Sequence, residues 1–172
     1  MAGAMVVYES MFGHTRQVAV AIASALPCES VALHEVGAAP VIVPDEVELL
    51  VVGGPTHAFS MSRPATRADA QKQSGRPNVS QRIGVREWLE LLDAGSNVQT
   101  AAFDTHVEHP KMLRHIGSAA ASIDRRLQLL GLRPCCEPEH FWVEATLGPL
   151  ADGQLEHARE WASALHANIV TT

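Results

Sequence analysis

Short apolar runs alternate along this chain with longer segments whose apolar residues recur at helical spacing. The short runs have the length and composition of β-strands, and they lie at residues 4–9, 30–36, 49–53, 99–104 and, within 133–145, around 141–143. The longer segments are predicted to be amphipathic helices, at residues 15–26, 85–92, 111–130 and 153–169. Pro27 is expected to end the first helix, and Gly131 the third.

This alternation predicts an α/β fold, a three-layer sandwich built on a five-stranded parallel sheet with right-handed crossovers. Residues 37–48 contain Pro40 and Pro44 and are too short and interrupted for a crossover helix. With no internal repeat and no sign of a second domain, we expect residues 1–172 to form a single domain. Ligands of such sheets bind at the carboxyl ends of the strands, so the loops after the first, third and fourth strands are the candidate sites.

The longest stretch without an apolar period is residues 60–82, which we expect to be a functional or disordered loop. Residues 63–86 hold six basic residues and one acid, a net charge of +5, which leaves −11 for the rest of a chain whose total is −6. Charge so placed favours a docking surface for an acidic partner or an anionic substrate. The alternative is a solvated mobile loop whose arginines only keep it out of the core.

Composition excludes several classes of protein. A net charge of −6 argues against general binding to nucleic acid or anionic membranes, and no apolar run approaches the ~20 residues of a membrane helix. The first residues lack the basic and apolar regions of a secretory signal. The cysteines, Cys28, Cys135 and Cys136, form neither a disulfide framework nor a CxxC motif. A reducing cytoplasm is therefore the expected location.

The first candidate loop joins a buried strand to the start of a helix and reads Ser10, Met11, Phe12, Gly13, His14, Thr15. Its hydroxyl groups, successive backbone N–H groups and helix N-terminus together make an anion-binding nest. A nest of neutral donors suits the binding of a phosphate monoester better than it suits hydrolysis or transfer of the phosphate group. The alternative is a plain turn in which a serine or threonine caps the helix.

The second candidate loop leaves the strand at residues 49–53 and therefore lies beside the first. It continues as Gly53, Gly54, Pro55, Thr56, His57, Ala58 and Phe59. Two glycines, a proline-fixed bend and one aromatic side chain are elements that grip a flat heteroaromatic ring. We expect Phe59 to pack on or beside such a ring, the alternative being an aromatic side chain tucked into the core.

These two loops resemble those of the flavodoxin family. Ser10, Gly13 and Thr15 match the family's phosphate loop, with Phe12 in place of its middle hydroxyl residue, and residues 51–59 look like its isoalloxazine loop. The same loops are also similar to those of tryptophan-repressor-binding-type quinone reductases, which read Ser-Met-Tyr-Gly-His in the first loop. The resemblance implies strand order 2-1-3-4-5 and non-covalent FMN. It assigns the cofactor to Ser10, Met11, Phe12, Gly13, His14, Thr15, Pro55, Thr56, His57, Ala58, Phe59, Asp104, Thr105 and His106.

The third loop, residues 104–110, departs from both families because it has neither a stacking tyrosine nor a glycine-rich stretch. The outer face of the ring is therefore expected to meet His106 or nothing. His106, His109 and His115 suggest a metal site, but no cysteine or carboxylate cluster supports one, and we expect no metal.

Three further residue types have both a chemical and a structural interpretation. His14 and His57 flank the expected flavin and can donate a hydrogen bond or shuttle a proton, or simply pack. The adjacent Cys135 and Cys136 are interpreted as small core residues rather than a redox pair. The tryptophans at apolar helical positions, Trp88 and Trp161, are expected in the core.

Three functions remain open on this sequence. The favoured one is an FMN-binding, flavodoxin-like electron-transfer protein that serves a redox partner protein or a small electron donor or acceptor. The first alternative is an NAD(P)H-dependent FMN quinone reductase, and the second is a binding module that kept the fold without flavin. The basic segment favours an acidic partner, no catalytic residue is predicted, and the sequence leaves the oligomeric state open.

Overall fold

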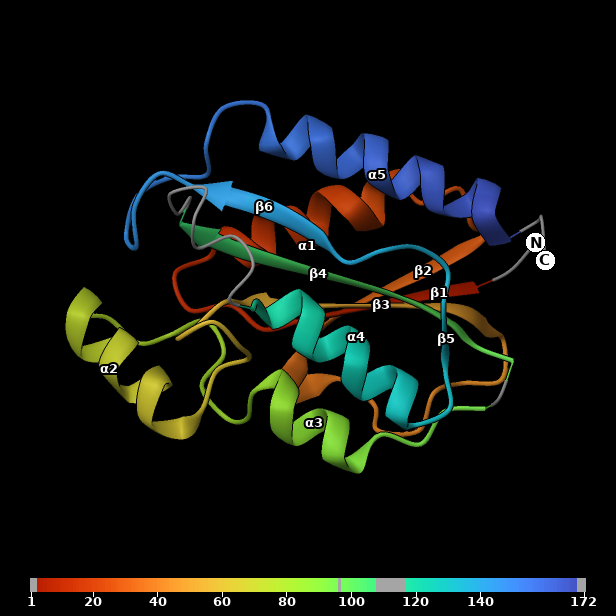
Figure 1. Cartoon of the computed structure of the whole chain (residues 1–172), viewed down its shortest axis with the longest axis horizontal. Coiled ribbons are helices and arrows are strands. Elements are labelled where there is room, and N and C mark those ends of the chain that lie inside the picture. The colour runs from red at the N-terminus through yellow and green to blue at the C-terminus, as the bar shows by residue number, and fades with distance from the viewer. Residues whose placement is uncertain (1–2, 96, 108–116, 170–172) are drawn as a thin grey trace.

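A parallel sheet forms the middle layer of the computed structural model, which describes residues 3–95, 97–107 and 117–169, with side chains up to residue 165 (Figure 1). Its strands are β1 (Gly3–Tyr8), β2 (Ser30–Glu35), β3 (Val47–Pro55), β4 (Gln99–Val107), β5 (Arg133–Pro134) and β6 (Glu139–Val143). The order is β2-β1-β3-β4-β5, and β6 also pairs with β4. The predicted order 2-1-3-4-5 is therefore confirmed.

The fifth position of the sheet is filled by two short strands rather than the single strand predicted within residues 133–145. β5 pairs with β4 over two residues, and the Cys135 amide still donates to the Thr100 carbonyl at 2.9 Å. Pairing resumes where Glu139 lies opposite Phe103. Pro138, which has no N–H to donate, stands directly before the second strand. The expected centre at residues 141–143 lies in β6.

Two helices cover each face of the sheet, which confirms the three-layer sandwich (Figure 1). One face packs against α1 (His14–Ala25) and α5 (Gln154–Ile169), the other against α3 (Val85–Leu91) and α4 (Ala119–Leu129). Successive residues of β1 alternate between these two cores, as the pleat of a strand requires. Trp88 is fully buried in the core under α3 and α4, and Trp161 packs against the core under α1 and α5, as predicted. Residues 37–48 contain no crossover helix, only the end of the 3₁₀ turn Val36–Ala38.

The prediction that residues 60–82 form a structureless loop was wrong, because they contain α2 (Pro64–Ser74). Only Ala70 of this helix is buried, so the sequence shows no apolar period there. The helix instead has proline in its first turn and ends at Gly75, whose φ is 66°. No helix among the described residues is long and apolar enough to cross a membrane.

Part of the third predicted helix is described, as α4. Residues 111–116 lie outside the described residues, and Gly117, with φ 123°, precedes the extended Ser118. The Ser118 side chain accepts a hydrogen bond from the Ala121 amide at 3.1 Å, so α4 starts at Ala119. Gly131 follows the end of the helix with φ 84°, as predicted for a terminating glycine.

A buried polar network ties α2 and α3 to the end of β1. The Glu9 carboxylate, only 1% exposed, accepts hydrogen bonds from the Ser62 hydroxyl and, at 2.8 Å, from the Val85 amide. Arg67 of α2 donates to the Ser62 hydroxyl at 2.9 Å and to Glu87 at 3.0 Å. Burial raises the pKa of Glu9, although these donors oppose the shift.

Replacing Glu9 with glutamine should stabilise the protein at neutral pH and change little below pH ~4. A carboxyl group whose pKa is raised by folding contributes its stability below its ordinary pKa, and loses it as pH rises through the higher folded pKa. Glutamine keeps the protonated shape, with an amide to face Ser62 and a carbonyl to accept from Val85. Urea unfolding at several pH values should show the advantage of Glu9→Gln growing with pH.

The matched control for that measurement is Glu90→Gln, on the exposed side of α3. It should follow wild type at every pH. A Glu9→Gln protein that is less stable than wild type at neutral pH would show that the ionised carboxylate is the favoured form in the fold.

Candidate functional site

A cavity of about 280 Å³ lies at the carboxyl ends of β1, β3 and β4, where the sheet topology predicted a ligand. Its walls come from the first loop, the second loop, the end of β4, one side of α2 and the segment around β6. The lining residues are Ser10, Met11, Phe12, His14, Thr15, Pro55, Thr56, His57, Ala58, Thr66, Asp69, Ala70, Gln73, Thr105, His106, Val107, Val143 and Thr146.

The first loop presents the N-terminus of α1 to this cavity. Gly13 stands at the N-cap of α1 with φ 96°, and α1 has neither a side-chain cap nor an acidic residue in its first turn. The Ser10 hydroxyl accepts from the amides of Gly13 at 3.1 Å and Arg16 at 3.4 Å. Gly13 thus occupies the N-cap position, while the Ser10 hydroxyl, three residues earlier, reaches the third amide of the helix. The amides of His14 and Thr15 begin the helix and have no acceptor within it.

The first and third loops are joined by a pair of buried hydroxyl groups. Thr15 and Thr105 lie 2.7 Å apart between their Oγ1 atoms, and both side chains are buried. The backbone of Ser10 is held by a further hydrogen bond, because its amide donates to the Ser80 hydroxyl at 3.0 Å. The loop therefore has a fixed shape before any ligand arrives.

The second loop makes a tight turn between His57 and Ser60. Two backbone hydrogen bonds, of 2.9 and 3.1 Å, close it, and its central residues Ala58 and Phe59 have φ of 47° and 64°. Such positive values are costly for residues other than glycine. Ala58 lines the cavity but Phe59 does not, so the aromatic side chain expected on a ring lies outside the lining.

Burial favours the neutral form of two of the histidines that line the cavity. Burial lowers the pKa of His14, and it also lowers that of His57, to which the charge of Arg67 adds. A neutral imidazole offers one donor and one acceptor to a ligand. This suits hydrogen bonding to a heteroaromatic ring or a phosphate rather than charge pairing.

One wall of the cavity was not foreseen from the sequence. Residues 66, 69, 70 and 73 of α2 follow the i, i+3, i+4, i+7 spacing of a single helix face and present Thr66, Asp69 and Gln73 to the cavity. No apolar stripe marks this face, so hydrophobic periodicity had no means of finding it.

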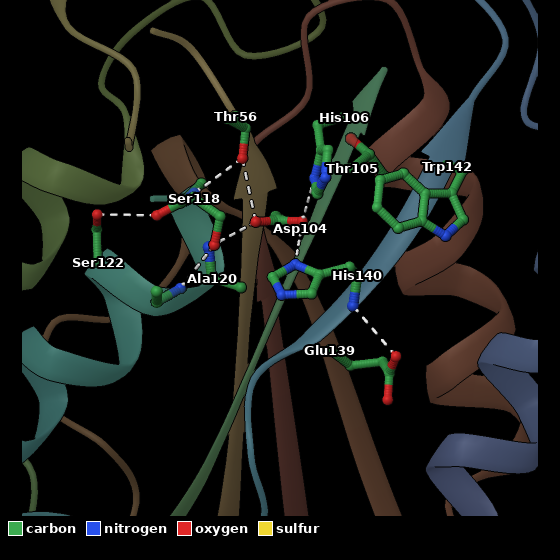
Figure 2. A network of polar contacts seen from close by, with 12 residues as sticks. Thr56, Asp104, Thr105, His106, Ser118, Ala120, Ser122, Glu139, His140 and Trp142 are labelled. Atoms are coloured by element: carbon green, nitrogen blue, oxygen red, sulfur yellow. Dashed lines mark hydrogen bonds and ion pairs between the residues drawn. The ribbon is translucent and has the colours of Figure 1, made fainter. Parts of the chain in front are cut away.

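Beneath the cavity, the buried carboxylate of Asp104 collects four hydrogen bonds (Figure 2). Oδ2 accepts from the Thr56 hydroxyl at 3.0 Å and the Ala120 amide at 2.9 Å. Oδ1 faces Nδ1 of His106 at 2.8 Å and Nδ1 of His140 at 3.0 Å. These bonds hold the pKa of Asp104 far below its usual range in spite of its burial, and Asp104 raises the pKa of His140.

His140 and Trp142, both on β6, were absent from the sequence-based site. The ring of Trp142 packs edge-on against that of His106, with centroids 4.5 Å apart, so the aromatic neighbour of His106 comes from the next strand. The available signal was the mixture of polar and apolar residues in Glu139–Val143. Which of these residues lie beside Asp104 and His106 depends on the register of β6 with β4.

The structure brings the first two predicted loops together with residues 104–107 of the third, which form the end of β4. Of the residues assigned to the cofactor, all line the cavity except Gly13, which shapes the first loop, Asp104, which lies beneath it, and Phe59. His109 and His115 lie outside the described residues. Cys135 and Cys136 are half-buried free thiols at the break between β5 and β6 and do not line the cavity.

The basic segment is less free than its sequence indicated. The Arg67 side chain is engaged with Ser62 and Glu87. Arg86 donates to the carbonyls of Met61 at 2.9 Å and Ser62 at 3.1 Å. Arg67 and Arg86 thus make hydrogen bonds within the protein. The other four basic residues are exposed, namely Arg63, Lys72, Arg76 and Arg82.

Neither protein-family models nor curated proteins match this sequence. Solved structures do match its fold over nearly the whole chain. A flavodoxin from the domain Archaea has a TM-score of 0.61 at 16% identity, covering 98% of this chain and 99% of its own. Flavodoxin 1 from Bacillus cereus has a TM-score of 0.62 at 14% identity, with 99% and 98% covered.

The third comparison concerns the other family that the loops resemble. A flavodoxin, WrbA-like protein from Agrobacterium tumefaciens has a TM-score of 0.59 at 16% identity, and 99% of each chain is covered. These similarities rest on architecture, because the identities are low throughout. Together with the strand order, they show that this chain has a flavodoxin-like fold.

Proposed function

We propose that this protein binds FMN without a covalent bond and transfers electrons. The observation that carries the proposal is the N-terminus of α1, whose N-cap residue is a glycine and which opens into a cavity at the carboxyl ends of β1, β3 and β4. The flavodoxin-like fold supports it. Bound FMN would supply one- or two-electron redox chemistry, and the residues of the chain position the cofactor.

The donor set fits a phosphate monoester. The amides of His14 and Thr15, with the positive end of the helix dipole behind them, can bind phosphate oxygens, and no lysine or arginine is among the lining residues. By contrast, the first amides of α4 are already taken by Thr56, Asp104 and Ser118. The flavin ring then lies toward His57 and His106, the lining histidines of the second and third loops.

Titration with FMN, followed by quenching of flavin fluorescence, tests this proposal. Wild type should bind one FMN per chain, and Gly13→Val should bind it about five- to thirtyfold more weakly. A Cβ at Gly13 would meet no atom within 4 Å, so the effect comes from its φ of 96°. Valine avoids that conformation, and the loop must return to it at a cost of ~1–2 kcal/mol when phosphate binds.

Gly131→Val is the matched control, because Gly131 has φ 84° and open space around its Cβ position but stands after α4, away from the cavity. It should lose stability yet keep its FMN affinity. Absence of saturable FMN binding by wild type would overturn the proposed function. Unchanged FMN affinity in a folded Gly13→Val protein would show that the first loop does not bind the phosphate.

A reductase is the second candidate, and a neighbouring cavity favours it. This cavity, of about 400 Å³, shares Met11, Phe12 and His14 with the first and is also lined by the exposed Arg76. An arginine there suits a phosphate group of a second ligand such as NAD(P)H. Rapid NADPH oxidation by the FMN-loaded protein with a quinone would identify a reductase, whereas a carrier requires a separate donor protein. A folded protein without FMN affinity would be the flavin-free binding module.

The partner class belongs to the same proposal. Arg63, Arg76 and Arg82 are exposed in the segment that follows the second loop, and they favour an acidic redox protein or an anionic donor. Such charges act mainly on the rate of encounter, so the rate of electron transfer should fall as salt screens them.

A further inference from the structure

We propose that Asp104, His106 and His140 form a binding site for a divalent transition-metal ion, with Zn²⁺ as the best match. The three side chains offer one carboxylate oxygen and two imidazole nitrogens, and these atoms all lie within 4.8 Å of one another. Two imidazoles and one carboxylate are a ligand set that zinc accepts in proteins. This inference does not depend on whether FMN binds.

Strand register creates the cluster. Asp104 of β4 lies directly opposite His140 of β6, and His106, two residues further along β4, points to the same face of the sheet. Both imidazoles turn Nδ1 toward the same oxygen, Asp104 Oδ1, at 2.8 and 3.0 Å (Figure 2). Two imidazole nitrogens from neighbouring strands thus face one carboxylate oxygen.

The ligands are held by a second set of contacts, as ligands of protein metal sites generally are. The other Asp104 oxygen, Oδ2, is fixed by Thr56 and Ala120, which leaves Oδ1 for the ion. Trp142 packs against the ring of His106 and limits its rotation. Asp104 itself is fully buried, so its carboxylate cannot turn away into solvent.

Only small movements are needed to admit an ion. Ligand atoms around a tetrahedral Zn²⁺, with bonds of about 2.1 Å, lie roughly 3.4 Å apart. The observed separations from Oδ1 must therefore grow by ~0.5 Å. His140, with 38% of its side chain exposed, has room to move and gives the ion a route from solvent. As the ion binds, each Nδ1 loses to solvent the proton that it donated to Asp104, and a ring that was neutral takes up a proton at Nε2, so that both rings ligate as neutral imidazoles.

Three protein ligands leave the fourth position of a tetrahedral ion open. Zinc sites that are purely structural are usually closed by four protein ligands, whereas an open position takes water or a small anionic ligand. His106 also lines the cavity, so this position lies at the cavity's edge. The site therefore has the form of one that binds an exogenous ligand next to the proposed cofactor.

Zn²⁺ itself is the probe for the test. Full-length protein is stripped with a chelator and titrated with Zn²⁺ by calorimetry, and a parallel titration with Co²⁺ reports four-coordination through its visible absorption. We expect one ion per chain. His106→Ala and His140→Ala should each weaken binding at least about a hundredfold, since even supporting residues outside the ligand set contribute ten- to a hundredfold.

His34→Ala, on β2 at the opposite edge of the sheet, is the matched control and should bind Zn²⁺ as wild type does. His140→Gln guards against misfolding, because it removes the ligand at a half-exposed position while keeping the side chain polar and of similar size. The proposal is overturned if wild type shows no stoichiometric Zn²⁺ binding, or if folded His106→Ala and His140→Gln proteins bind as tightly as the control.

Discussion

Replacing Gly53 with alanine is expected to lower the free energy of unfolding by about 3 kcal/mol or more. A Cβ at this position would lie 2.1 Å from Cζ of Phe103 on the neighbouring strand, far inside van der Waals contact. The Phe103 ring is fully buried, with Phe141 and Trp161 at centroid distances of 6.1 and 6.3 Å, so it has nowhere to retreat. Urea unfolding measures the loss.

The next residue of β3 provides the control. A Cβ at Gly54 would meet its nearest neighbours, Glu9 and Val85, at 3.8 Å, which is ordinary contact. Gly54→Ala should therefore differ from wild type by less than about 1 kcal/mol. If the two variants prove equally stable, the packing of Phe103 against a bare backbone is not what requires glycine at position 53.

Replacing Asp104 with alanine should cost about 3–5 kcal/mol, the range seen when one partner of a buried charged network is removed. The change leaves the Ala120 amide, the Thr56 hydroxyl and two imidazoles without their shared acceptor. Unfolding should be measured with a chelator present, so that a bound metal ion makes no contribution.

Asp45→Ala, at an exposed position before β3, is the companion measurement for Asp104→Ala and should stay within about 0.5 kcal/mol of wild type. A small loss from Asp104→Ala as well would mean that the donors find water or other acceptors once the carboxylate is gone. The network would then position side chains without adding to stability.

The layers of this fold could be predicted because its strands are buried on both faces. Residues 49–53 are apolar throughout and indicate a central strand. In residues 15–26 the apolar residues recur at helical spacing and indicate the buried face of a helix. The loops that follow such strands meet by topology, so the first loop and its Gly13 could be found without coordinates. A helix such as α2, whose single buried residue is Ala70, gives no comparable signal.

The site was less predictable where a residue's role depends on its neighbour across the sheet. The sequence suggests that the paired glycines 53 and 54 serve a ligand, whereas Gly53 makes room for Phe103. His140 lies 36 positions beyond Asp104, and only the pairing of β6 with β4 brings them together. β4 is buried on both faces over most of its length, so its sequence lacks the alternation of apolar and polar residues that would select one register with β6.

The sparse attachment of α2 has a consequence for how quickly a ligand can leave. This helix is anchored by Ala70, by the contacts of Arg67 and by the Asn78 side chain, which donates to the Arg67 carbonyl at 2.8 Å. Its amide hydrogens should exchange with solvent through local opening, at a free energy well below that of the sheet. Residence time in the cavity would then follow the opening of one helix, and thermal stability of the whole protein would be a poor guide to it.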